Sequence, residues 1–157
     1  MKQKSLIMIR PEGIPHRDSI IKKIEEVSNI IKAKPYHALP SEIIEEFYEE
    51  HKEKDFFPWL VNHHAGKHVE FYILEAQCEG DNLYNLVDET VGPTDPTEAR
   101  KLARKGYDSI RSWSLDDLAQ ARIKKRMVQN IIHRSKNRED AKREMNIAFQ
   151  RDIYNKI

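Results

Sequence analysis

The residues best suited to chemistry lie late in the chain, in the run Asn130-Ile-Ile-His133-Arg-Ser135, which Glu144 follows. If this run is a strand, His133 and Ser135 share a face, because alternate residues of a strand point the same way. Glu144 lies on the next predicted helix and can fold back toward the end of the strand. A carboxylate that holds one imidazole nitrogen leaves the other free to attack, so His133 is a candidate nucleophile. The alternative is a histidine that only packs and hydrogen-bonds at the end of a buried strand.

Two other kinds of site are considered from residue spacing. His64 and His68 have the i, i+4 spacing of helical metal ligands, but Gly66 lies between them and is expected to end the helix. The single cysteine, Cys78, excludes an internal disulfide and a zinc site built from cysteines. The five glycines form no glycine-rich phosphate loop, so side chains would have to hold any phosphates.

Charge is distributed unevenly along the 157 residues. Residues 100–143 carry 14 Lys and Arg against 5 Asp and Glu, whereas the remainder carries 13 against 21. A basic half suggests a partner that carries phosphates, and the alternative is a solvated, charge-rich surface. No stretch approaches the roughly 18 apolar residues of a membrane span. The N-terminus lacks the long apolar region of a signal peptide, so we expect a cytoplasmic protein.

Short apolar runs predict the elements that position these residues. Their periodicity and punctuation predict strands and helices in alternation, with short helices on a surface loop at residues 97–126. Strands are expected at 5–9, 29–39 and 68–76 and in the buried apolar run 127–132, with residues 130–135 alternating if they too are a strand. Helices are expected at 20–27, 42–51, 55–61, 82–91 and 138–149. Two β-α-β units of this kind predict an α+β fold, a four-stranded sheet with helices on one face.

Six segments resemble the nucleoside diphosphate kinase family, in family order, over about residues 4–149. The third resembles the family's Gly-x-Thr-Asn/Asp-Pro segment, and the fifth resembles the Asn-x-x-His-Gly/Ala-Ser run around the phosphorylated histidine. The segments are Ile7-Met-Ile-Arg-Pro-Glu-Gly13, Tyr48 with Lys54-Asp-Phe-Phe57, Val91-Gly-Pro-Thr-Asp-Pro96, Ser109-Ile-Arg111, Asn130-Ile-Ile-His-Arg-Ser135, and Glu144 at the family spacing.

The resemblance implies a fold and an activity. The fold would be one ferredoxin-like βαββαβ domain over residues 1–157, with a four-stranded antiparallel sheet and an extended arm near residues 97–126. The activity would be transfer of the γ-phosphate of a nucleoside triphosphate to a nucleoside diphosphate, by a ping-pong reaction through phosphohistidine. Mg²⁺ would be carried by the nucleotide phosphates. A homo-oligomer, hexamer or tetramer, would be expected, with neither a membrane nor a nucleic acid as partner.

The resemblance also assigns residues. His133 matches the nucleophile, Glu144 the carboxylate that orients it, and Ser135 the neighbouring hydroxyl. Tyr48 and Arg10 match groups near the transferred phosphate, with arginine at position 10 in place of the family lysine. The matching nucleotide-binding set is Arg10, Phe56, Leu60, Thr94, Arg111 and Asn130.

The sharpest departure from the family pattern is Asp88, which stands where the family has an arginine six residues before Thr94. A second departure is Arg134, where glycine or alanine is usual. A carboxylate repels phosphates, so an active enzyme must turn Asp88 away or neutralise it with a nearby cation, and Asp88→Arg should tighten nucleotide binding. We expect the arm to compensate in charge through Arg100, Lys101, Arg104 and Lys105.

Two other functions stay open at this stage. Asp88 favours a catalytically weakened family member that acts as a nucleotide-binding regulatory module. The excess of Lys and Arg in residues 100–143 is also compatible with a nucleic-acid-binding protein, whose affinity would fall steeply with salt.

Overall fold

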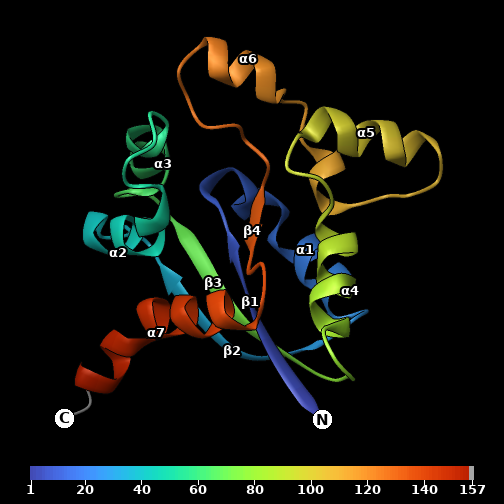
Figure 1. The fold of residues 1–157 in the computed structure, drawn as a ribbon, viewed down its shortest axis with the longest axis vertical. Coiled ribbons are helices and arrows are strands. Elements are labelled where there is room, and N and C mark those ends of the chain that lie inside the picture. The colour runs from blue at the N-terminus through green and yellow to red at the C-terminus, as the bar shows by residue number, and fades with distance from the viewer. Residues whose placement is uncertain (156–157) are drawn as a thin grey trace.

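The structure is a computed structural model that describes residues 1–155, with side-chain environments described as far as Phe149. Its centre is a four-stranded sheet in the order β2-β3-β1-β4, with every neighbouring pair antiparallel (Figure 1). The strands are β1 (Lys2–Ile9), β2 (Asn29–Tyr36), β3 (Val69–Gln77) and β4 (Ile132–Arg134). The predicted antiparallel α+β fold is therefore confirmed.

Helices cover both faces of this sheet, so the expectation of a single covered face is wrong (Figure 1). The cause lies in β1, where Leu6 and Met8 join the core on one face while Ile7 and Ile9 join the core on the other. A strand that is apolar on both faces needs cover on both. One face packs against α2 (Ser41–Phe47), α3 (Phe57–His64) and α7 (Arg138–Asn155), and the other against α1 (Arg17–Ile24) and α4 (Asn82–Val91).

The polar segment 97–126 forms short helices, as its sparse apolar residues predicted. It contains most of α5 (Pro96–Arg104), the 3-10 turn η3 (Ile110–Trp113) and α6 (Leu118–Ile123). The remaining short turns are η1 (Pro11–His16) and η2 (Glu49–His51). No helix among residues 1–155 is long and apolar enough to cross a membrane.

The strand predicted within residues 127–135 is shorter in the structure, because the chain bends sharply just before it. Ile131 has a φ of 78°, a left-handed conformation that is costly for a β-branched residue. The segment after β1 holds this bend: the Arg10 backbone N–H donates to the Ile131 carbonyl at 2.9 Å, and the Ile131 N–H donates to Glu12 Oε2 at 3.1 Å. Gly13 is required here, because a Cβ on it would lie 2.4 Å from the Ile131 carbonyl oxygen.

Candidate active site

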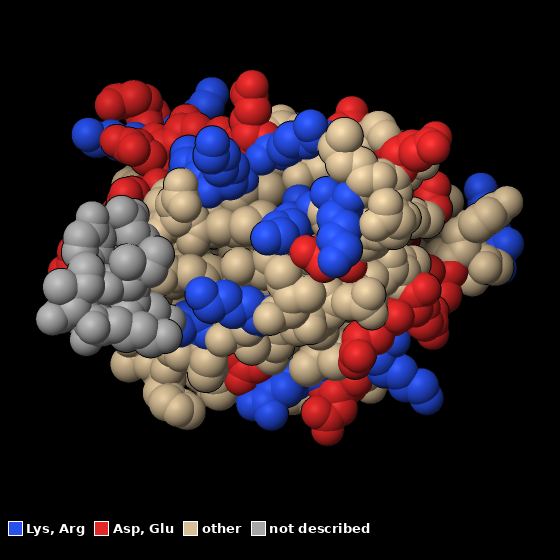
Figure 2. All heavy atoms as spheres, turned by 90° about the horizontal axis from the view of Figure 1, so that it is seen from below, with Lys and Arg blue, Asp and Glu red and all other residues tan. Residues whose placement is uncertain are grey.

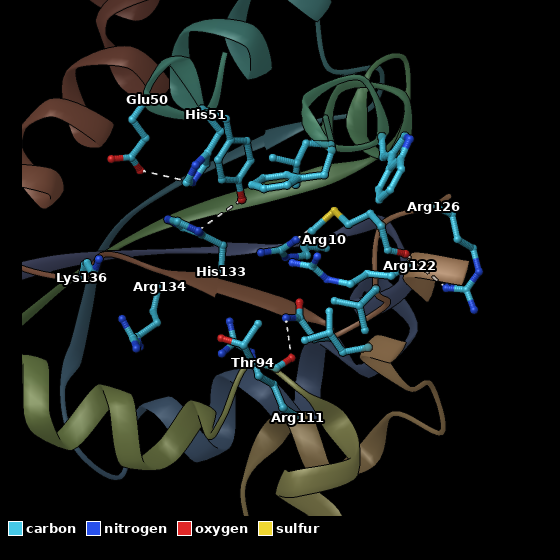
Figure 3. A pocket seen from close by; sticks show the side chains of 18 of the residues that line it. Arg10, Glu50, His51, Thr94, Arg111, Arg122, Arg126, His133, Arg134 and Lys136 are labelled. Carbon is cyan, nitrogen blue, oxygen red and sulfur yellow. Dashed lines mark hydrogen bonds and ion pairs between the residues drawn. The ribbon is translucent and has the colours of Figure 1, made fainter. Parts of the chain in front are cut away.

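Both ring nitrogens of His133 have partners, and Figure 3 shows the contact of one of them. Nε2 lies 2.8 Å from Glu144 Oε1, and Nδ1 lies 3.2 Å from the Tyr48 hydroxyl. Ser135 Oγ donates to the same Glu144 oxygen at 2.8 Å. An ionised Glu144 can only accept, so Nε2 carries the ring proton and Nδ1 keeps its lone pair. Nδ1 is therefore the nitrogen that can act as a nucleophile.

Helix α7 brings Glu144 to the histidine. The helix begins with the predicted cap, since Asn137 Oδ1 accepts from the Asp140 backbone N–H at 2.8 Å. The Glu144 side chain is only 4% exposed, and Arg143 Nη2 lies 3.7 Å from its second oxygen. Held among these donors, the Glu144 carboxylate keeps the imidazole in one orientation.

Burial sets the protonation states of the reacting groups. It lowers the pKa of His133, and although Glu144 raises that pKa, the positive charges of Arg10 and Arg111 lower it further. Burial also raises the pKa of Tyr48. At neutral pH the site thus presents a neutral imidazole beside a protonated phenol, which are the forms that nucleophilic attack and hydrogen-bond donation require.

Two buried arginines lie beside the histidine. Arg111 donates from Nη1 to the Gly92 carbonyl and from Nη2 to the Ile132 carbonyl, each at 3.0 Å. Arg10 Nη1 lies 3.2 Å from Met127 Sδ. Burial lowers the pKa of Arg111 to about 9, which leaves it charged at neutral pH. Neither arginine has a carboxylate within ion-pair distance among the described residues, so both can offer their charge to an anion in the cleft.

A cleft of about 440 Å³ opens above His133. Nine of the ten sequence-predicted site residues line it, and the tenth, Ser135, is fully buried behind Glu144. Phe56 lines the cleft whereas its neighbour Phe57 does not. Asn130 donates from Nδ2 to the Thr94 carbonyl at 3.0 Å and thereby joins two sides of the cleft. The lining predicted residues are Arg10, Tyr48, Phe56, Leu60, Thr94, Arg111, Asn130, His133 and Glu144.

Sequence reasoning missed several other lining residues. Trp59 extends the aromatic side of the cleft, and Arg122 and Arg126 bring positive charge to the end of Figure 3 opposite Lys136. Asp116 holds Arg126 by two hydrogen bonds of 2.6 and 2.8 Å, which lower the pKa of that carboxyl. For Arg122 and Arg126, the only signal in the sequence was the basic composition of residues 100–143. The full additional set is Glu50, His51, Trp59, Leu118, Arg122, Arg126, Met127, Val128, Arg134, Lys136 and Asp140.

The four cations predicted to compensate for Asp88 do not line the cleft, so that expectation is wrong. Arg100 instead donates to the backbone carbonyls of Ser114 and Asp116, which links α5 to the segment before α6. Lys101 pairs with Glu98 on its own helix at 3.2 Å. These side chains stabilise the arm or face solvent. The cations of the arm that line the cleft are instead Arg122 and Arg126.

Asp88 is neutralised, as an active site would require. Its Oδ1 lies 2.5 Å from Arg134 Nη2, and Asp88 itself does not line the cleft. This agrees with the expectation that Asp88 is turned away from the phosphates or neutralised by a nearby cation. The expected tightening of nucleotide binding by Asp88→Arg stays a prediction.

The histidine pair considered for a metal does not share a helix. α3 ends at His64, Gly66 has a φ of 73°, and His64 Nδ1 lies 2.7 Å from the Leu60 carbonyl oxygen. Over the described part of the chain, no three His, Cys, Asp or Glu side chains are grouped so that they could hold a metal ion.

Comparisons with known proteins show the family to which the chain is similar. The family model described as nucleoside diphosphate kinase matches residues 3–153. The chain is 27% identical to a nucleoside diphosphate kinase of Methanocaldococcus jannaschii, covering 97% of this chain and 96% of the relative. It is 33% identical to one of Sulfolobus acidocaldarius, covering 94% and 90%. The structure of the Aquifex aeolicus nucleoside diphosphate kinase superimposes with a TM-score of 0.76 at 29% identity, covering 95% and 96%.

Proposed function

This chain belongs to the nucleoside diphosphate kinase family, and we propose that it transfers the γ-phosphate of a nucleoside triphosphate to a nucleoside diphosphate through phosphohistidine at His133. The observation that carries the proposal is the Glu144–His133–Tyr48 arrangement at the floor of a cationic cleft. A positioned, neutral imidazole with one free nitrogen is the group that a covalent phosphoryl intermediate needs.

In the first half-reaction, the Nδ1 lone pair of His133 attacks the γ-phosphorus. The Nδ1–P bond forms as the bond from phosphorus to the bridging oxygen breaks, and the nucleoside diphosphate leaves with that electron pair. The Nε2 proton stays with the ring, where Glu144 stabilises the positive charge that develops. In the second half-reaction, a terminal phosphate oxygen of another diphosphate attacks the phosphohistidine, the Nδ1–P bond breaks, and neutral His133 is restored.

Tyr48 has two successive roles in this scheme. Its hydroxyl donates to Nδ1, and it must release that lone pair before attack. Once released, the same O–H can donate to an oxygen of the phosphoryl group. Because its pKa is raised, the hydroxyl keeps its proton at neutral pH.

Arg10 and Arg111 supply positive charge where the transferred group must lie, and phosphoryl transfer depends mainly on such positioning. Mg²⁺ would be held by the phosphate oxygens and would neutralise part of their charge. The cationic lining fits an ion that arrives with the nucleotide better than one held by the protein alone.

The mouth of the cleft suits a base. Phe56 and Trp59 offer aromatic surfaces and Leu60 an aliphatic one, all half-buried or buried. Stacking tolerates any base because every base has a π-face, so broad nucleotide specificity is the natural consequence. Assembly into a homo-oligomer and a cytoplasmic location remain expectations that rest on family membership.

A catalytically weakened, nucleotide-binding regulatory module would have the same cleft and is distinguished only by turnover. The face shown in Figure 2, which lies away from α5 and α6, carries Lys and Arg side chains interspersed with Asp and Glu. Within the basic segment, Arg126 and Lys101 are already paired with Asp116 and Glu98.

The test is phosphate transfer from ATP to a different diphosphate, such as CDP. The intact chain should form CTP, and His133→Ala should form none. His37→Ala is the control, since His37 is an exposed histidine that does not line the cleft. Undiminished CTP formation by His133→Ala would overturn the assignment, and nucleotide binding without CTP formation by the intact chain would favour the regulatory module.

A further inference from the structure

Arg134 directly follows the proposed nucleophile and lines the cleft (Figure 3). Its Nη2 pairs with Asp88 on α4, on the side of β4 where α4 packs. The Asp88 side chain is 55% exposed and lies outside the cleft lining, whereas the Arg134 side chain is 24% exposed. The pair therefore joins an external carboxylate to a guanidinium that faces the cleft.

Most donors of this guanidinium are unused. An arginine has five N–H groups in a fixed fork, and within the described residues only Nη2 of Arg134 has a partner. Nε is buried without one. A carboxylate that binds one edge of the fork restricts its rotation and leaves the other donors for a ligand.

Arg134 also adds positive charge near Arg111. Its charge is among those that disfavour the protonated form of Arg111, so the two guanidiniums lie close enough to repel each other. Asp88 is the only carboxylate paired with Arg134 in the described part of the chain. An anion between these cations would relieve the repulsion.

We infer that Arg134 binds phosphate oxygens of the nucleotide beside His133 and that Asp88 positions its guanidinium. This inference rests on the proposed function and assigns a further substrate-binding residue to the same cleft. It also gives a physical reason why the two departures from the family pattern, Asp88 and Arg134, occur together: the cation is supplied from β4, and α4 supplies the carboxylate that holds it.

A purely structural role is the competing explanation, in which the pair only ties α4 to β4. An ion pair this exposed contributes little to stability, so its loss would have a small effect on folding. The two explanations separate cleanly by substitution. Both Arg134→Ala and Asp88→Ala break the tie, but only Arg134→Ala removes the guanidinium.

The experiment measures the Kd of ADP and the KM for ATP with the intact chain and three variants, Arg134→Ala, Asp88→Ala and Arg104→Ala. Arg104 is exposed on α5 outside the cleft, so it controls for the loss of one positive charge. We expect Arg134→Ala to raise the Kd of ADP and the KM for ATP about tenfold each, because a charge-assisted contact is lost. Asp88→Ala should change them less than about threefold, and Arg104→Ala less than about twofold.

Thermal unfolding of each variant checks that the affinities are measured on folded protein. If Arg134→Ala fails to fold, Arg134→Gln takes its place. Equal losses in Arg134→Ala and Asp88→Ala would overturn the inference in favour of a structural tie. A loss in Arg134→Ala no larger than in Arg104→Ala would also overturn it. If either result overturned the inference, CTP formation by the intact chain would still support the proposed function. An intact chain that binds no nucleotide would contradict the inference and the proposed function alike.

Discussion

The two ends of the cleft are built differently. At the inner end, Arg10, Arg111 and Glu144 are each at most 6% exposed, and backbone carbonyls or neighbouring side chains hold Arg111 and Glu144. At the mouth, Phe56 is half-buried on the short segment before α3, and Arg122 is exposed at the end of α6. Side chains from several strands and helices hold the inner end of the cleft in place, whereas short helices form its mouth.

This difference follows from what each end must do. Attack on phosphorus depends on near-contact geometry, so a misplacement of about 1 Å can cost about 100-fold in rate. A stacking surface only has to cover a base, and its energy varies little with small displacements. Substitutions at the inner end should therefore change turnover, and those at the mouth should change affinity.

The largest effect is expected for Glu144→Ala. Without this carboxylate, the His133 ring loses both its orientation and the charge that stabilises its developing cation, so kcat should fall about 100-fold with little change in nucleotide affinity. Glu139→Ala, an exposed residue in the first turn of the same helix, is the control and should behave as the intact chain. A Glu144→Ala enzyme that loses affinity while it keeps kcat would break the distinction between the two ends.

Phe56→Ala tests the mouth. Loss of stacking should weaken binding of all nucleotides alike by about 1–3 kcal/mol, with kcat largely kept. Phe57→Ala is the matched control, because Phe57 packs against the core outside the cleft and should reduce thermal stability rather than affinity. A strong loss for one base alone would contradict a general stacking platform.

Gly13→Ala tests how the inner end is held. The added methyl group must displace the Ile131 carbonyl, and with it the bend that presents Asn130 and His133, so kcat should fall severalfold and the free energy of unfolding by about 1–3 kcal/mol. Gly106→Ala is the comparison, since Gly106 has open space around it and its φ of 96° strains an alanine by backbone conformation alone, so this variant should lose stability and keep kcat. If both variants lose stability equally and both keep full kcat, the bend does not position the site.

The smallest effect concerns pH. A protonated imidazole has no lone pair at Nδ1, and the pKa of His133 is lowered from its usual value of about 6.5. The rate of His133 phosphorylation should therefore stay constant as pH falls from 8 to about 6.5 and decline only below that value. Single-turnover rates with saturating ATP measure this directly. A decline that begins well above pH 6.5 would mean that the imidazole is not kept neutral by its surroundings.

The sequence predicted the inner end better than the mouth. Strand alternation and the spacing to Glu144 made His133, Ser135 and Glu144 candidates for one site, because these residues lie on adjacent elements, and the resemblance to the family favoured them over a merely packed histidine. The resemblance to the family added Tyr48 and Arg10, which come from distant elements. Periodicity cannot provide such long-range neighbours.

Three features were not predictable from local patterns. The sheet is covered on its second face because both faces of β1 are apolar. A short run of Leu, Ile and Met in the sequence does not show which helices pack against each face. The bend at Ile131 depends on Gly13 and Glu12, far away in sequence. Asp88 pairs with Arg134 rather than with Arg100 or Lys101 because the fold brings Arg134 near it. The composition of the segment gives its charge but does not show where each side chain lies.

The most direct test of the account is the position of phosphate on the protein. After reaction with Mg-ATP and removal of nucleotide, the phosphoprotein should carry an acid-labile phosphate on Nδ1 of His133, because Nε2 is held by Glu144. Phosphorus NMR of the isolated phosphoprotein distinguishes the two ring nitrogens, and peptide mapping identifies the residue. Added CDP should then remove the phosphate as CTP. Phosphate on Nε2, on another residue, or resistant to CDP would contradict the account.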